Sequence, residues 1–135
     1  MQARSVYLPL IFTCLIFGTV VFAQEGHPLV GSWHGDWGTS ATDRKDFTVV
    51  MDWDGTIVSG VVNPGFDQMK LQNAKLTPKG WTVHFEVDRK EGAGTVHCMI
   101  DGKIDKLGSD RRTLTGTYTC GATKGDFKLT RDRDY

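Results

Sequence analysis

The chain has few features that specify a chemistry by themselves. Its 135 residues include only three cysteines, and its sixteen basic residues are balanced by sixteen acidic ones. An interspersed, balanced charge gives no electrostatic reason to bind nucleic acid or an anionic membrane, so neither is expected as a partner. The sequence also contains no nucleophile motif, phosphate loop or metal fingerprint. We therefore expect no cofactor, and the function has to be argued from the fold.

The first 23 residues have the pattern of a secretory signal. Arg4 precedes an apolar run over residues 6–22, and Val-Phe-Ala at 21–23 forms a cleavage site. A retained anchor is the alternative, because the run approaches the ~18 residues of a spanning helix. We expect cleavage, with residues 1–23 removed and residues 24–135 forming one domain without a membrane span. The location is then secreted or periplasmic, and the sequence leaves the oligomeric state open.

The body of the chain reads as strands. No stretch has the 3.6-residue period of an amphipathic helix, whereas short alternating runs recur between turn residues such as Asp54-Gly55. Connections this short join antiparallel neighbours, and closing the meander into a barrel removes two exposed edges. The predicted fold is all-β, an eight-stranded antiparallel up-and-down barrel. The predicted strands are Leu29–Trp37, Lys45–Trp53, Thr56–Val62, Gln68–Leu76, Gly80–Asp88, Gly94–Ile104, Arg112–Cys120 and Gly125–Arg131.

Alternation along these strands predicts which side chains face inward. Aromatic residues share one face of each strand, and the parity of the fourth strand changes near Asn73, which predicts a bulge there. Three glycines, Gly35, Gly60 and Gly116, have inner-face parity. They either open a cavity or relieve crowding and let the strands coil.

Two segments give the chain a family resemblance. Gly31-Ser32-Trp33 opens the first strand, and Phe-Lys-Leu-Thr-Arg at 127–131 ends the last. This resembles the calycin superfamily of lipocalins, fatty-acid-binding proteins and avidins, in which a first-strand tryptophan packs against a basic residue of the closing strand. Trp33 and Arg131 are the matching positions, and the resemblance implies a small closed barrel. The chain is also similar to small exported bacterial β proteins of unassigned function, which adds no activity.

A barrel of this size is either filled by side chains or just wide enough for one small ligand. We expect a binding module for a small apolar or amphipathic molecule, because aromatic residues concentrate at inner-face parity. An enzyme would need converging polar groups inside, and alternation places nearly all of them outside, so a non-enzymatic protein is favoured. The alternative is a filled structural or interaction barrel of the cell envelope. The expected ligand walls are Trp33, Trp37, Trp53, Trp81, Phe85 and Tyr118.

Polar residues offer a competing interpretation. Pairing about the turn at 90–94 sets Glu86 opposite His97 with His84 nearby, and two imidazoles with a carboxylate could hold zinc in a hydrolytic or metal-dependent enzyme. The simpler interpretation is cross-strand pairing on the outer face, so no metal is expected. His34 and Asp36 share parity and form a second candidate, an acid/base pair.

Two cysteines remain after the signal, since Cys14 lies within it. Cys98 and Cys120 both lie 11 residues from Ser109, so pairing of their strands about that residue sets them face to face. An oxidising compartment favours a disulfide between them. Two buried thiols are the alternative.

Overall fold

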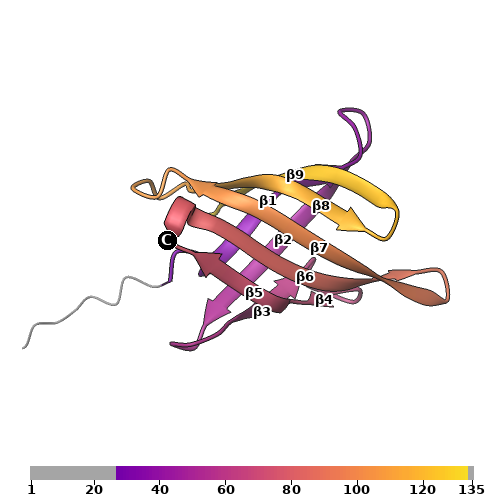
Figure 1. Cartoon of the computed structure of the whole chain (residues 1–135), viewed down its shortest axis with the longest axis horizontal. Coiled ribbons are helices and arrows are strands. Elements are labelled where there is room, and N and C mark those ends of the chain that lie inside the picture. Colours follow the sequence, from indigo (N-terminus) through magenta and orange to yellow (C-terminus); the bar gives the residue numbers. More distant parts are fainter. Residues whose placement is uncertain (1–26, 134–135) are drawn as a thin grey trace, which may run out of the picture.

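A single antiparallel sheet curls into a nearly closed barrel (Figure 1). The computed structural model describes residues 27–133, so the predicted signal and Gln24 lie outside the described residues. Within them there is no α-helix, and no helix is long and apolar enough to cross a membrane. The all-β prediction is confirmed. The elements are β1 (Gly31–Gly38), β2 (Arg44–Trp53), β3 (Val58–Val62), β4 (Met69–Lys70), β5 (Gln72–Thr77), the 3₁₀ turn η1 (Lys79–Trp81), β6 (Thr82–Glu91), β7 (Gly94–Asp105), β8 (Thr113–Cys120) and β9 (Thr123–Arg131).

The strands form an up-and-down meander in which the last strand pairs with the first. Every pair of strands that are consecutive in sequence is hydrogen-bonded, with the exception of β4 and β5. β1 pairs with both β2 and β9. The two ends of the sheet order are β4 and β5, which are joined through Leu71. β4 pairs with β3 and β5 pairs with β6, while the Leu71 amide donates to the Gly60 carbonyl at 2.9 Å. The segment formed by β4, Leu71 and β5, which bends at Leu71, thus nearly closes the barrel.

This bend corrects the predicted strand count from eight to nine. The expected fourth strand, Gln68–Leu76, breaks at Leu71, where the chain changes its partner from β3 to β6. The predicted bulge is present, because the register with β6 shifts between Gln72 and Lys75, and Asn73 has a positive φ of 50°. Asparagine tolerates this conformation better than most residues.

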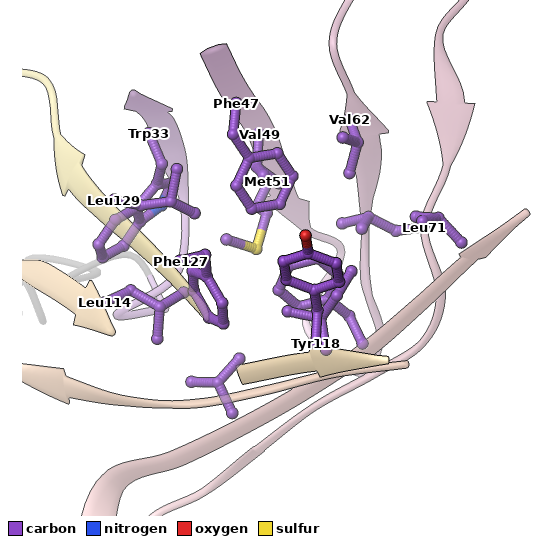
Figure 2. Close-up of a cluster of buried hydrophobic side chains, with 14 of the residues drawn as sticks. Trp33, Phe47, Val49, Met51, Val62, Leu71, Leu114, Tyr118, Phe127 and Leu129 are labelled. Carbon is purple, nitrogen blue, oxygen red and sulfur yellow. The ribbon is translucent and has the colours of Figure 1, made fainter. Parts of the chain in front are cut away.

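The core fills the barrel between its ends (Figure 2). Trp33 has no exposed surface, and its Nε1 donates to the Leu29 carbonyl at 2.8 Å. Residues 27–30 cover the end at which β1 begins, since Arg112 donates to the Pro28 carbonyl and Arg131 to the Val30 carbonyl. Trp33 and Arg131 are direct partners between β1 and β9. The two residues that carry the resemblance therefore meet at this closed end.

Cys98 and Cys120 form a disulfide between β7 and β8. They are direct partners in the ladder, so both the predicted bond and the register from which it was argued are confirmed. Both residues are buried, and the bond lies in the half of β8 that leads to the β8–β9 hairpin.

The inner-face glycines allow close strand contact and do not open a cavity. A Cβ on Gly35, Gly60 or Gly116 would lie 1.7, 1.9 or 1.9 Å from a carbonyl oxygen of the neighbouring strand. Any side chain there would force the strands apart. Of the two roles considered for these glycines, the structure therefore supports strand coiling at the corners of the barrel.

Candidate functional site

The barrel is hollowed at the end opposite residues 27–30. A cavity of about 810 Å³ lies there, among the β1–β2 loop, the 63–68 loop and the β6–β7 and β8–β9 hairpins. Its buried side chains are Trp37, Met69 and Tyr118, which form the floor beside the buried Gly38. Charged side chains surround them. The charged lining consists of Asp43, Lys45, Asp46, Asp67, Asp88, Arg89, Lys90 and Glu91.

Aromatic packing fixes the floor. The Trp37 ring lies flat on Phe47, with ring centroids 4.4 Å apart and planes 2° from parallel, and Tyr118 tilts against Trp37 at 5.0 Å. The Tyr118 ring lies over Gly125 of the adjacent strand β9, where an added Cβ would lie 2.7 Å from the ring. The glycine in β9 therefore makes room for the contact between Tyr118 and Trp37. In Figure 2 Tyr118 projects from its strand among the core side chains.

The two aromatic residues of the floor keep polar atoms available. Trp37 and Tyr118 are only 6% and 5% exposed, and neither the Trp37 Nε1 nor the Tyr118 hydroxyl hydrogen-bonds to any described residue. Neither atom is sealed from solvent, because no unpartnered side-chain nitrogen or oxygen is fully buried in the described part of the chain. Burial raises the pKa of Tyr118, so its hydroxyl stays protonated at neutral pH. Both atoms can thus donate to a bound molecule.

Strand alternation turns two cations toward the cavity. On β6, Phe85 and Val87 are buried, and Arg89 continues their face; on β2, Lys45 continues the face of buried Phe47. Arg89 has one weak partner, Glu91, with Nη2 and Oε2 3.7 Å apart. Lys45 forms no ion pair with a described residue.

The expected aromatic residues divide into three groups. Trp37 and Tyr118 line the cavity, whereas Trp33 and Phe85 are completely buried in the packed core. The prediction that Trp53 and Trp81 face the interior is wrong, because they are 42% and 38% exposed.

Local structure explains both corrections. Trp53 is the last residue of β2, and its ring contacts His27 outside the barrel core at 5.2 Å. Trp81 belongs to η1 with a positive φ of 53°, so the alternation of β6 begins only at Thr82. The sequence interpretation extended the strand two residues too far and assigned Trp81 to the wrong face.

Sequence reasoning missed Met69, Lys45 and Arg89 as cavity residues. The signal for the two cations was present, since each lies two positions beyond a buried aromatic or aliphatic residue on the same strand face. Met69 could not be placed, because it lies in β4 beside the bend that the sequence interpretation treated as a continuous strand.

The histidines and carboxylates predicted to cluster do so on the outer face. Both His97 nitrogens lie 2.7 Å from carboxylates, Nδ1 from Asp88 and Nε2 from Glu86. His84 lies 2.9 Å from Glu86 through Nε2 and 2.7 Å from Asp101 through Nδ1. The result is an unbroken chain, Asp101 to His84 to Glu86 to His97 to Asp88. We call these five residues the outer-face network.

The register behind this prediction is corrected by two residues. Asp88 lies opposite His97, and Glu86 lies opposite Met99. The hairpin turn between β6 and β7 is tighter than expected, because Glu91 pairs directly with Gly94. His97 still reaches Glu86, diagonally across the ladder.

Hydrogen bonds and charge favour ionised groups in the outer-face network. The two histidines, then Asn73, hold the pKa of Glu86 down at about 2. Bonds to Asp88 and Glu86 raise the pKa of His97, and although burial opposes it, bonds to Glu86 and Asp101 raise the pKa of His84. Each imidazole is thus favoured as a cation with both nitrogens donating. No group of three or more His, Cys, Asp or Glu in residues 27–133 is arranged to hold a metal.

The second polar candidate is separated by the structure. His34 Nδ1 lies 2.6 Å from Asp132, while Asp36 pairs with Arg44. His34 and Asp36 therefore do not form the expected acid/base pair. His34 instead pairs with Asp132, which follows β9, and Asp36 pairs with Arg44 of β2.

The fold and the cavity define a class of molecule: a single-sheet antiparallel barrel with one end closed by its own chain and the other open above an aromatic floor. Comparison with protein families, curated proteins and solved structures found no match. The function is therefore argued from the geometry alone.

Proposed function

We propose that this protein is a non-enzymatic binding module that receives a small amphipathic molecule in the cavity at the open end of the barrel. The observation that carries the proposal is the floor, where Trp37 and Tyr118 present ring surface together with two polar atoms that have no partner in the described chain. Ligand sites are typically concave, of about 300–1,000 Å³, with apolar walls and a few directed polar groups. The cavity, at about 810 Å³ and with an aromatic floor that carries two polar atoms, matches this description.

The location of the site follows from the packing. The centre of the barrel is filled by Trp33, Phe47 and Phe85, each with no exposed surface, so a ligand fits above this layer and not within it. The aromatic stack on Phe47 and the nearby disulfide at Cys120 hold the floor in place. A preformed floor loses little conformational entropy when a ligand binds.

Tryptophan fluorescence tests the proposal with a neutral probe, naphthylmethanol. The probe should quench the wild-type emission saturably, and Tyr118→Ala should weaken its binding in a variant whose circular dichroism remains that of a folded barrel. Trp81→Phe is the matched control, because Trp81 lies outside the cavity, and it should bind as the wild type does. Quenching that disappears only with Trp81→Phe would place the probe elsewhere and reject the site.

A second candidate function is an interaction barrel of the cell envelope. It is favoured by apolar side chains left on the surface, above all Phe66, which is 99% exposed in the 63–68 loop. A fully exposed phenylalanine has no role in the packing of an isolated barrel. A fluorescence titration with naphthylmethanol distinguishes the two candidates. A binding module should be quenched with one probe molecule bound per protein, whereas the fluorescence of an interaction barrel should not change.

Export is part of the same proposal. The Cys98–Cys120 bond fits an oxidising compartment, which agrees with the expected signal.

A further inference from the structure

The floor of the cavity offers hydrogen-bond donors. The indole nitrogen of Trp37 can only donate, and the protonated Tyr118 hydroxyl has a proton to give. Both atoms lack an acceptor among the described residues and remain open to solvent. A ligand group that satisfies both is an acceptor.

Strand alternation places two cations, Lys45 and Arg89, on the inner face near these donors. Lys45 lies directly opposite Trp37 in the β1–β2 ladder, on the same inner face. Arg89 lines the same cavity as Tyr118 and continues the inner face of Phe85 and Val87. Both cations therefore belong to the lining that contains the two donors.

Most carboxylates of the lining are turned away or occupied. Asp88 belongs to the outer-face network and also accepts from Gln72 at 2.9 Å, and Asp46 lies on the outer side of β2. Asp43 accepts from the Thr39 hydroxyl at 2.6 Å, and its charge acts on Tyr118 in the direction opposite to that of Arg89. Two carboxylates remain, on the 63–68 loop and at Glu91; Glu91 pairs weakly with Arg89 at 3.7 Å, and neither adjoins Trp37 in the ladder as Lys45 does.

We propose that the ligand of this cavity carries an anionic group, a carboxylate or a similar acid, held between Lys45 and Arg89 and accepting hydrogen bonds from Trp37 Nε1 and Tyr118 Oη. Its apolar body lies against Met69 and the aromatic rings. This inference rests on the proposed function and adds the charge of the ligand. Charge-assisted hydrogen bonds to a partly desolvated anion are stronger than neutral ones, so the acid group contributes affinity as well as orientation.

A series of three probes with one ring system tests the charge: naphthoate, naphthylmethanol and naphthylmethylammonium. At low ionic strength, naphthoate should bind about tenfold more tightly than the alcohol, and the ammonium compound less tightly than either. Added salt should reduce the advantage of naphthoate, because the cations lie at the open end of the barrel.

Variants locate the effect. Lys45→Gln and Arg89→Gln should each remove most of the advantage of naphthoate over naphthylmethanol, whereas Tyr118→Phe should weaken naphthoate while retaining a folded barrel. Lys75→Gln, which removes an exposed lysine outside the cavity lining, is the matched control and should change nothing. Equal affinity for all three probes, or preference for the ammonium compound, would overturn the anion inference and leave the proposed function standing. Absence of binding by every probe would overturn both.

Discussion

Tyr118 occupies its position because a neighbouring residue has no side chain. A Cβ on Gly125 would meet the Gly38 carbonyl oxygen at 2.2 Å and the Tyr118 ring at 2.7 Å. An alanine at this position would displace both the Gly38 backbone and the Tyr118 ring. The shape of the cavity floor therefore depends on a residue that sequence reasoning did not single out.

Gly125→Ala should destabilise the barrel by about 1–3 kcal/mol, the usual cost of overpacking, and should separate Tyr118 from Trp37. Urea denaturation measures the first effect, and loss of probe quenching measures the second. Gly108→Ala is the matched control, since a Cβ there has no neighbour within 4 Å and should alter stability by less than about 0.5 kcal/mol. Equal stability of the two variants would show that the strands can adjust at Gly125.

At the scale of the element, the bent segment that joins β4 to β5 is held to β6 by side chains as well as by the ladder. Asn73 donates to Glu86 at 3.0 Å and Gln72 donates to Asp88 at 2.9 Å, at the point where the register shifts. The outer-face network orients both carboxylates. Its ionisation therefore affects the closure of the barrel.

The stability of the barrel should depend on pH with a maximum between about 4.5 and 6.5. His84 and His97 have raised pKa values in the folded state, so their contribution is complete below 6.5 and is lost as the pH rises through the folded values. The pKa of Glu86 falls from 4.5 to about 2 on folding, so its contribution is complete above 4.5 and is lost as the pH falls toward 2.

Chemical denaturation across this pH range measures the effect. Glu86→Gln should flatten both limbs of the profile, because Glu86 links the two histidines. Glu91→Gln, a substitution on the same strand but outside the outer-face network, should leave the profile unchanged. A wild-type profile that lacks the alkaline decline would contradict the raised histidine pKa values.

The disulfide makes a separate prediction about β7 and β8. Replacing both Cys98 and Cys120 by serine should lower the free energy of unfolding by about 3 kcal/mol, as expected for a bond that closes a loop of this length. Thiol counting on the denatured, unreduced mature protein should find no free thiol. Two free thiols would show that the bond does not form in the exported protein.

At the scale of the whole molecule, the two ends of the barrel differ in structure. Residues 27–30 cover one end through backbone carbonyls that accept from arginines, and the other end remains open above Trp37 and Tyr118. In the proposed function, the ligand enters at this open end.

Export should yield a mature chain that begins at Gln24. Intact mass on secreted or periplasmic material checks this, with a further loss of ammonia if the new N-terminal glutamine cyclises. A mass that includes residues 1–23 would reject the cleavage and with it the proposed location.

Alternation and turn chemistry were sufficient to predict the all-β meander, the bulge at Asn73 and the register that pairs Cys98 with Cys120. These are local properties, because a period of two and a short hairpin fix which residues face each other. Trp37 and Tyr118 were predicted as inward-facing for the same reason. Trp81 was misassigned because a single turn with positive φ interrupts the alternation.

The amino-acid sequence by itself thus determined the all-β meander, the faces of most strands and the disulfide, since each depends on residues close in the chain or on one hairpin. Only the tertiary structure decided that the core is filled and that the cavity lies at one end. Those features depend on how far strands approach at glycines and where the bend at Leu71 closes the sheet. Contacts between distant strands set both, and alternation along one strand carries no information about them.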